Sequence, residues 1–252
     1  GNARLVYRDL HIYDANGQTV SGHFVVGADP ARPGALAIVV DDASARYPLT
    51  IDPLTGSPAS PDFTATGAAP GEQFGWSVAG AGDVNGDGYA DVIVGAQGFG
   101  GNSGRAYVFR GGPSGLSASA AFSATGEGPE SFFGSSVAGA GDVNGDGYAD
   151  VIVSASGYIS DTGRAYLYHG GPSGLSASPA FTATGEATSN FFGRSVAGAG
   201  DVNGDGYADV IVGAFGYITN TGRAYVYHGG PSGLSASLAF TATDAATNDR
   251  FG

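Results

Sequence analysis

The chain has no cysteine, no methionine and no lysine among its 252 residues, and charged residues make up only 13% of it. Without cysteine, neither a disulfide framework nor a thiolate metal site can form. Ten arginines stand against 23 Asp and Glu residues, which gives a formal net charge of −13. A protein that binds nucleic acid needs clustered Lys and Arg to neutralise phosphates, so we expect no nucleic-acid partner.

Long apolar runs are also missing, because no stretch of 18 or more apolar residues and no apolar leader is present. We therefore expect a soluble segment with no membrane span, while a signal peptide or anchor can lie outside it. The apolar content of 42% is sufficient for a buried core. The 46 glycines recur at a fixed period, which is typical of tight turns between short strands.

The sequence repeats itself with a period of 59 residues. The segment FGWSVAGAGDVNGDGYADVIVGA begins at Phe74, and close copies begin at Phe133 and Phe192, with a further start at Phe251. No long stretch shows the helical spacing of 3.6, so we expect few helices. Runs rich in β-branched and aromatic residues predict four strands in the first copy. These strands are Ser77 to Ala81, Asp91 to Gly95, Arg105 to Phe109 and Ala121 to Thr125.

Four short antiparallel strands at this repeat length are typical of a β-propeller blade. We therefore predict an all-β fold with a propeller segment over residues 61–252, and blades near 74–132, 133–191 and 192–250. A propeller closes with about four to eight blades. Either further blades follow in the parent chain, or another chain completes the ring, or the blades stack in an open array. The start of a fourth copy at 251 favours the first alternative.

Residues 1–60 differ from the repeats and alternate like strands, with an Asn-Gly turn signal at Asn16. We predict a small antiparallel β-domain there. The proline-rich passage from Pro53 to Pro61 is then a linker into the first blade, or an ordered crossover.

Each repeat contains the loop DVNGDGYAD, with side-chain oxygens at positions 1, 3, 5 and 9. Position 7, a tyrosine, adds a backbone carbonyl. Ca²⁺ takes six to eight such oxygens, and a flexible loop suits it better than octahedral Mg²⁺. We predict three calcium sites, one per loop. The predicted ligands are Asp83, Asn85, Asp87, Tyr89 and Asp91; Asp142, Asn144, Asp146, Tyr148 and Asp150; and Asp201, Asn203, Asp205, Tyr207 and Asp209.

Other interpretations of this loop fit the sequence less well. An EF-hand needs a bidentate Glu at position 12 between helices, whereas this sequence has Val94, Val153 or Val212 there, between strands. The absence of His and Cys from the loops argues against zinc. A simple hairpin turn without an ion would leave three carboxylates repelling one another in each repeat.

The Phe-Gly start, the acidic loop, and Gly-Ala after a Val-Ile-Val strand together resemble the FG-GAP repeat of integrin α-subunit propellers and their bacterial relatives. The resemblance covers Phe74 to Gly252, and the proline of the consensus Gly-Ala-Pro is missing from all copies. It implies a seven-bladed propeller, calcium loops that stiffen the blades, and extracellular adhesion or recognition. Integrins also use a partner subunit and an additional metal-bearing domain, and this sequence shows neither. The N-terminal YPLTIDP resembles a strand-rich region that precedes such repeats in bacterial surface proteins.

We do not expect an enzyme, because the polar residues recur once per repeat, whereas a catalytic constellation is normally assembled once. His169 and His228 occupy one repeat position, where the first copy has Arg110, which favours a structural role. His11 and His23 lie on expected strands with no recognisable partner. Trp76, the single tryptophan, takes a position that differs between copies, and we interpret it as an exposed aromatic between blades.

The sequence therefore favours a calcium-stabilised, extracellular or cell-surface module for adhesion or for recognition of a protein or glycan. Two alternatives stay open: a structural subunit or spacer of a surface fibre, and a non-catalytic part of a secreted hydrolase or lyase. Calcium loops of this kind fill reliably where calcium is millimolar, which favours secretion. A ligand site would lie in the loops that differ between copies, namely Gln97 to Ser103, Gly157 to Thr162 and Gly216 to Thr221.

Overall fold

The computed structural model describes residues 11–13, 22–26, 36–40, 50–52, 63–236, 238–243 and 250–252. The chain divides into two units, Gly1–Asp62 and Phe63–Gly252. We refer to the second one as the repeat unit.

The first unit contains short antiparallel strand pairs. Strand β1 (His11–Tyr13) pairs with β4 (Thr50–Asp52), and β2 (Gly22–Val26) pairs with β3 (Leu36–Val40). His11 and His23 thus lie on strands, as expected. The predicted linker from Pro53 to Pro61 lies outside the described residues.

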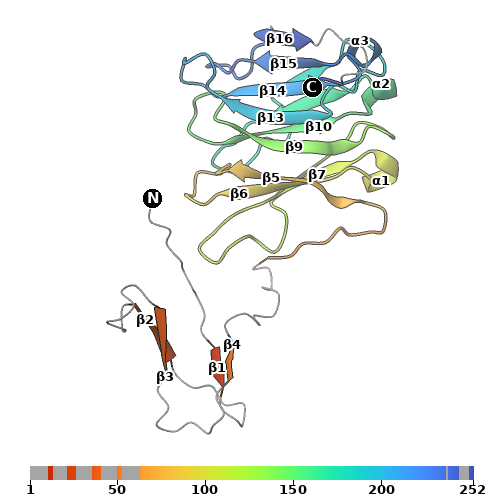
Figure 1. The fold of residues 1–252 in the computed structure, drawn as a ribbon. Coiled ribbons are helices and arrows are strands. Elements are labelled where there is room, and N and C mark those ends of the chain that lie inside the picture. Colours follow the sequence, from red (N-terminus) through yellow and green to blue (C-terminus); the bar gives the residue numbers. More distant parts are fainter. Residues whose placement is uncertain are drawn as a thin grey trace. The chain divides into compact units, whose positions relative to one another are not determined.

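The repeat unit contains three four-stranded antiparallel sheets, and within each sheet the strands follow chain order (Figure 1). The first sheet consists of β5 (Phe74–Gly82), β6 (Asp91–Ala96), β7 (Arg105–Phe109) and β8 (Phe122–Thr125). The second consists of β9 (Phe133–Gly141), β10 (Asp150–Ala155), β11 (Arg164–Tyr168) and β12 (Phe181–Thr184). The third consists of β13 (Ser195–Gly200), β14 (Asp209–Ala214), β15 (Arg223–Tyr227) and β16 (Phe240–Thr243).

These sheets confirm the predicted all-β class and the four strands per repeat. The structure extends the first expected strand, because β5 begins at Phe74 instead of Ser77. The number of blades in a closed ring stays a prediction.

The sheets stack face to face, and the second sheet is buried on both sides (Figure 1). On β10, Val151 and Val153 belong to the core shared with the first sheet, whereas Ile152 between them belongs to the core shared with the third. Successive side chains of a strand point to opposite faces, so a strand between two sheets must be apolar at every position. This requirement explains the continuous Val-Ile-Val run in each repeat.

The phenylalanine that starts each repeat packs against the tyrosine of the GRAY motif. The ring centroids of Phe133 and Tyr166 are 5.2 Å apart at an interplanar angle of 67°. The equivalent pair Phe192 and Tyr225 is 5.1 Å apart. Edge-to-face contacts of this kind stabilise a core by about 0.5–1.5 kcal/mol beyond their buried area.

Glycine in the first strand of each sheet allows neighbouring sheets to approach closely. A Cβ on Gly139 of β9 would lie 2.7 Å from the carbonyl oxygen of Gly80 on β5. A Cβ on Gly198 of β13 would lie 2.7 Å from the carbonyl oxygen of Gly139 in the same way. The SVAGAG segment therefore keeps its glycines because the backbones of adjacent strands meet there.

The helical segments are single turns that contain left-handed residues: α1 (Phe99–Asn102), α2 (Tyr158–Asp161) and α3 (Tyr217–Asn220). Ile159 has a φ of 41° and Ile218 a φ of 32°, and both side chains are exposed. Positive φ is costly for β-branched residues, so these turns are strained. The expectation of few helices is confirmed for the described residues, among which no helix is long and apolar enough to cross a membrane.

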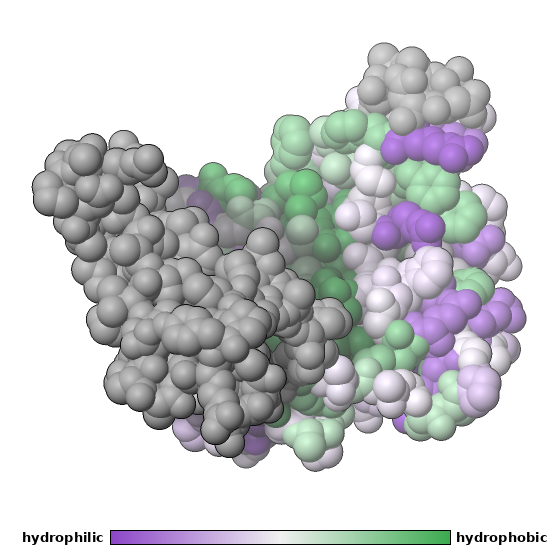
Figure 2. All heavy atoms as spheres, turned by 60° about the horizontal axis from the view of Figure 1, so that its bottom comes forward, coloured by the Kyte–Doolittle hydropathy of each residue, from purple (hydrophilic) through white to green (hydrophobic). Residues whose placement is uncertain are grey.

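Both outer faces of the stack carry exposed apolar side chains. Val143 is 0% exposed between the second and third sheets, whereas Val202, at the same position of the next repeat, is 56% exposed. At the opposite end, Val78 on β5 is 68% exposed. Figure 2 brings this end forward and shows hydrophobic residues gathered along the middle of the visible face. The third repeat thus presents the surface that the first two repeats bury.

This difference predicts unequal effects of the same substitution. Val143→Ala should lower the free energy of unfolding by about 2 kcal/mol, because it removes buried methyl groups and leaves a cavity. Val202→Ala should cost less than half as much. Urea unfolding of the two variants checks this. Equal losses would show that the outer face of the third sheet is covered in solution.

Candidate functional site

The acidic loops connect the first two strands of each sheet, and the carboxylate at position 1 organises each loop. Asp83 accepts hydrogen bonds from the backbone N–H groups of Gly86, Asp87 and Gly88 at 2.7, 3.1 and 2.7 Å. Burial raises the pKa of Asp83, but these hydrogen bonds outweigh burial and hold its pKa below the ordinary value. Asp142 and Asp201 accept the equivalent three backbone hydrogen bonds in their loops.

The side chains at positions 3 and 5 of each loop are joined by a hydrogen bond. The amide of Asn85 donates to Asp87 Oδ2 at 2.8 Å, and Tyr89 N–H donates to Asp87 Oδ1 at 3.0 Å. The carbonyl oxygen Oδ1 of Asn85 is buried and accepts no hydrogen bond from the described residues. In the other two loops the equivalent oxygens of Asn144 and Asn203 accept the N–H of Asp146 and Asp205.

Position 9 holds the loop to the sheet. Asp91 is buried, and its two oxygens accept the N–H groups of Val84 at 2.9 Å and Gly111 at 2.8 Å. Asp150 and Asp209 make the same two bonds in their repeats. Burial raises the pKa of Asp150 to about 6, although the N–H groups of Val143 and Gly170 lower it. The carboxylate thus joins the loop to the end of the third strand, a role that sequence analysis missed.

The tyrosine at position 7 contacts the loop of the preceding repeat. A Cβ on Gly86 would lie 2.6 Å from Cε1 of Tyr148, so only glycine leaves space for that ring, and Gly86 also has a φ of 74°. The backbone adds a bond here, because Ala149 N–H donates to the Asp83 carbonyl at 3.0 Å. Tyr207 packs against Gly145 in the same way. The loops of successive sheets are therefore in direct contact.

The donor chemistry of the loops fits a hard cation, because every candidate ligand is an oxygen. The carboxylates of a loop are held apart by backbone N–H groups, and no cluster of three or more His, Cys, Asp or Glu gathers in the described part of the chain. The free Oδ1 of Asn85 is an oxygen that a cation would satisfy. The predicted ligands and the three calcium ions thus stay a prediction.

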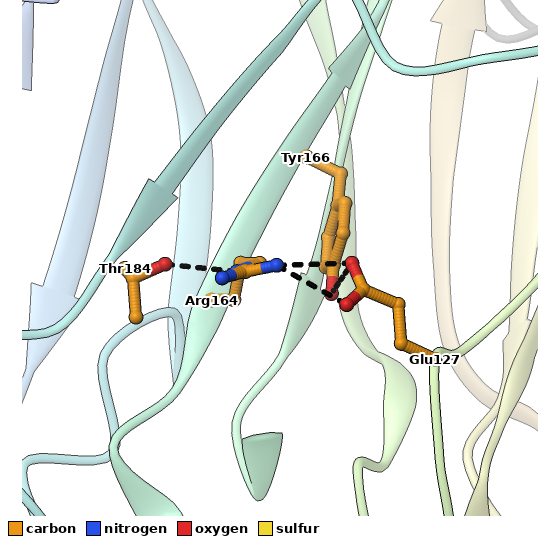
Figure 3. A network of polar contacts seen from close by, with 4 residues as sticks. All are labelled: Glu127, Arg164, Tyr166 and Thr184. Atoms are coloured by element: carbon orange, nitrogen blue, oxygen red, sulfur yellow. Dashed lines mark hydrogen bonds and ion pairs between the residues drawn. The ribbon is translucent and has the colours of Figure 1, made fainter. Parts of the chain in front are cut away.

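A second polar network joins the second sheet to the connection that precedes it (Figure 3). Arg164 Nη1 on β11 lies 3.0 Å from Glu127 Oε1, and Tyr166 donates to the same oxygen at 3.1 Å. Arg164 Nε donates to Thr184 Oγ1 at 2.8 Å on β12, and its guanidinium lies 3.9 Å from the ring centroid of Tyr158. Burial, and then the Glu127 carboxylate, raise the pKa of Tyr166. The tyrosine therefore stays a hydrogen-bond donor.

A cavity of about 340 Å³ lies where loops of all the repeats meet. Trp76, which is 51% exposed, lines it together with the stacked pair Phe191 and Phe215, whose ring centroids are 4.8 Å apart. The other lining residues are Gln97, Phe132, Ser156, Asp161 and Arg194. Of the loops expected to vary, two contribute directly, through Gln97 and Asp161, and Phe215 immediately precedes the third.

The repeat position of Arg110, His169 and His228 lies at the contact between sheets. The guanidinium of Arg110 donates to the Ser173 carbonyl of the next repeat. His169 lies against Gly233 of the following repeat, since a Cβ there would be 2.9 Å from its Nε2. This nitrogen is buried and makes no hydrogen bond with the described residues. These contacts agree with a structural role.

The role of Asp150 leads to a prediction that does not depend on metal. Asp150→Asn retains one acceptor oxygen, so one of the two buried N–H donors loses its partner. The free energy of unfolding should fall by about 1–3 kcal/mol in excess chelator. Asp146→Asn, in the exposed part of the same loop, is the control and should cost less. If both variants lost the same stability in urea unfolding, Asp150 would have no special structural role.

Comparison with known proteins shows which families have similar sequences. Residues 74–109 match the FG-GAP repeat, and residues 142–212 match the FG-GAP-like repeat. Integrin alpha-6 of Gallus gallus is 32% identical over 199 residues, which are 76% of this chain and 17% of the integrin. Integrin alpha-5 of Xenopus laevis is 33% identical over 202 residues, 75% of this chain and 19% of the integrin.

Integrin alpha-7 of Homo sapiens is 34% identical over 200 residues, 76% of this chain and 15% of the integrin. The chain therefore spans less than a fifth of the length of these relatives. The matches to these repeats contain all three acidic loops and part of each sheet. The chain contains FG-GAP repeats, and these are similar to sequences of integrin α-subunits.

Proposed function

We propose that the repeat unit is an extracellular recognition module that binds a protein or glycan ligand in adhesion and is stabilised by calcium. Its similarity to integrin α-subunits supports an adhesion or recognition role. The main support for the proposal is the composition of the cavity of about 340 Å³ that Trp76 lines. It is lined by repeat positions whose residue type changes from copy to copy.

These positions contrast with those that maintain the fold. The Phe and Tyr of each interlocking aromatic pair and the aspartates of each loop are the same in every copy. The cavity positions differ between copies, and they hold Trp76 and Arg194 at one position and Gln97, Ser156 and Phe215 at a second. A third position has Phe132 and Phe191 in the cavity, where the first copy has Gln73. Residues that differ in otherwise uniform repeats, gathered at one cavity, are typical of a ligand site.

The cavity can hold a ligand that has an apolar face and polar edges. The aromatic rings offer flat apolar surfaces, and Arg194 and Asp161 supply one charge of each sign. A sugar ring or a peptide side chain has these properties.

Three features support calcium in the loops. The loops contain no basic residue to neutralise their aspartates. Hydrogen bonds keep Asp83 ionised, and Asn85 Oδ1 lacks a donor. Asp83, Asn85, Asp87, Asp91 and the backbone carbonyl of Tyr89 would hold the ion in the first loop, where Asp91 also supports the loop from the sheet. The equivalent residues would do so in the other loops. When bound, calcium would supply positive charge where the carboxylates of a loop otherwise repel one another. Filling of such sites by millimolar calcium favours a location outside the cell.

The open third sheet supports a second, structural role. Val202, Phe240 and Leu238 are 56%, 60% and 45% exposed on this sheet or beside it. We infer that another four-stranded repeat covers them, because the first two repeats bury Val84 and Val143 against such a neighbour. Further repeats would close a ring, and repeats of other chains would build a fibre.

Calcium should raise the melting temperature of the protein. Each site that is filled at a hundred times its Kd stabilises the native state by about 2.7 kcal/mol. Isothermal titration calorimetry should give three ions per chain, and Asp83→Asn should remove one of them. Asp161→Asn, outside the loops, should retain all three. An unchanged melting temperature in excess chelator and the absence of binding heat would disprove calcium stabilisation.

The recognition site should depend on its aromatic walls. The chain can be tested on glycan arrays and on immobilised extracellular-matrix proteins, with calcium present. Trp76→Ala should weaken binding of any ligand found at least tenfold, because it removes a stacking surface. Val78→Ala is the control, since Val78 is exposed on the same strand but does not line the cavity. A ligand that both variants bind as tightly as the wild type would lie elsewhere.

A further inference from the structure

The network of Glu127, Arg164 and Tyr166 occurs twice in the repeat unit. In the next repeat, Arg223 Nη1 lies 2.9 Å from Glu186 Oε1, and Tyr225 donates to the same oxygen at 3.0 Å. In both copies a guanidinium and a phenol hydroxyl converge on one carboxylate. The glutamate precedes the sheet, and the arginine and tyrosine lie on its third strand.

The first repeat retains two members of this network. Arg105 and Tyr107 on β7 occupy the positions of Arg164 and Tyr166, but Ala68 stands where the other repeats have glutamate. Arg105 is oriented as in the other copies, because its Nε donates to Thr125 Oγ1 at 2.9 Å. Its guanidinium also lies 3.6 Å from the ring centroid of Phe99. The cation is therefore held in position without the carboxylate.

A cavity adjoins Ala68 and Tyr107, although Arg105 is not among the residues that line it. This cavity of about 340 Å³ is lined by residues 64–68 and by Tyr107, and it shares no residue with the cavity that contains Trp76. The acid in the same connection is Glu72, which is buried and accepts the N–H of Ala68 at 2.9 Å. No ion pair joins Arg105 to Glu72 or to another carboxylate among the residues that the structure describes.

We propose that Arg105 and Tyr107 form a binding site for a carboxylate, and that an acidic side chain of a protein partner occupies it. The two complete copies show that this pair accepts a glutamate side chain in hydrogen-bonding geometry. A guanidinium with a fixed fork and an adjacent hydroxyl suit a planar carboxylate. This site is separate from the proposed ligand cavity, because the two cavities share no lining residue. It also binds a different chemical group.

Propionate, which has the length of the glutamate side chain, is the probe. It is titrated into the full chain at constant ionic strength, with chloride as the balancing anion, and the Arg Nε–Hε signals are followed by ¹H–¹⁵N NMR. The Arg105 signal should shift with half-saturation at roughly 10–100 mM propionate. It should not shift with chloride alone. The signals of Arg164 and Arg223 should stay in place, because glutamates occupy their sites.

Two variants provide matched controls. Ala68→Glu restores the missing carboxylate, so the Arg105 signal should take the position seen with saturating propionate and should no longer respond to it. Glu127→Ala empties the second copy, so Arg164 should begin to respond to propionate. If Arg164 responds in Glu127→Ala while Arg105 never responds in the wild type, the proposal is wrong. A response of Arg105 that persists in Ala68→Glu would also overturn it.

The partner is tested with a short peptide that contains one glutamate, capped at both termini. It should shift the Arg105 signal of the wild type and lose this effect in Ala68→Glu. The matching glutamine peptide should have no effect in either protein. If the glutamine peptide acts equally, the site does not recognise a carboxylate.

Discussion

Strand β10 has no exposed side, since Val151 and Val153 are buried against the first sheet and Ile152 is buried against the third. A sheet with two apolar faces cannot exist alone, so each sheet depends on its neighbours. Close stacking then requires backbones that can approach one another, which is why Gly139 lies between Gly80 and Gly198. The repeated glycines and the continuous apolar strands are two consequences of this one constraint.

Stacking also determines how the ends of the strands satisfy their polar groups. The loop backbone turns away from the sheet and leaves N–H groups without strand partners. In the first repeat Asp83 and Asp91 accept four of these N–H groups, and Asp91 also accepts the N–H of Gly111 after the third strand. The aspartates are therefore required by the backbone whether or not an ion is present. A cation in the loops would reduce the electrostatic cost of a carboxylate arrangement that hydrogen bonds already hold in place.

The sequence was sufficient to predict the elements that repeat, because each strand has a local signal and the period aligns the copies. Phe74 and Phe133 thus mark the starts of the first two sheets correctly, whereas the third sheet begins at Ser195, after Phe192. Contacts between residues far apart in the sequence have no local sequence signal. Glu127 meets Arg164 37 residues later, and the pairing depends on how one sheet stacks on the next. The support that Asp91 gives to Gly111 was missed for the same reason, since the loop pattern alone suggested only a metal ligand.

Uniform repeats make each exception informative. Packing, glycine contacts and loop hydrogen bonds impose the same residue on every copy, so a position that escapes these constraints can change without loss of the fold. Trp76 and Arg194 at one position, and Ala68 and Glu127 at another, are such differences. The first pair lines a cavity, and Ala68 leaves a positioned arginine without the carboxylate that its equivalents hold. Function in this chain is therefore to be sought in the departures from the repeat, while the residues that repeat maintain the stack.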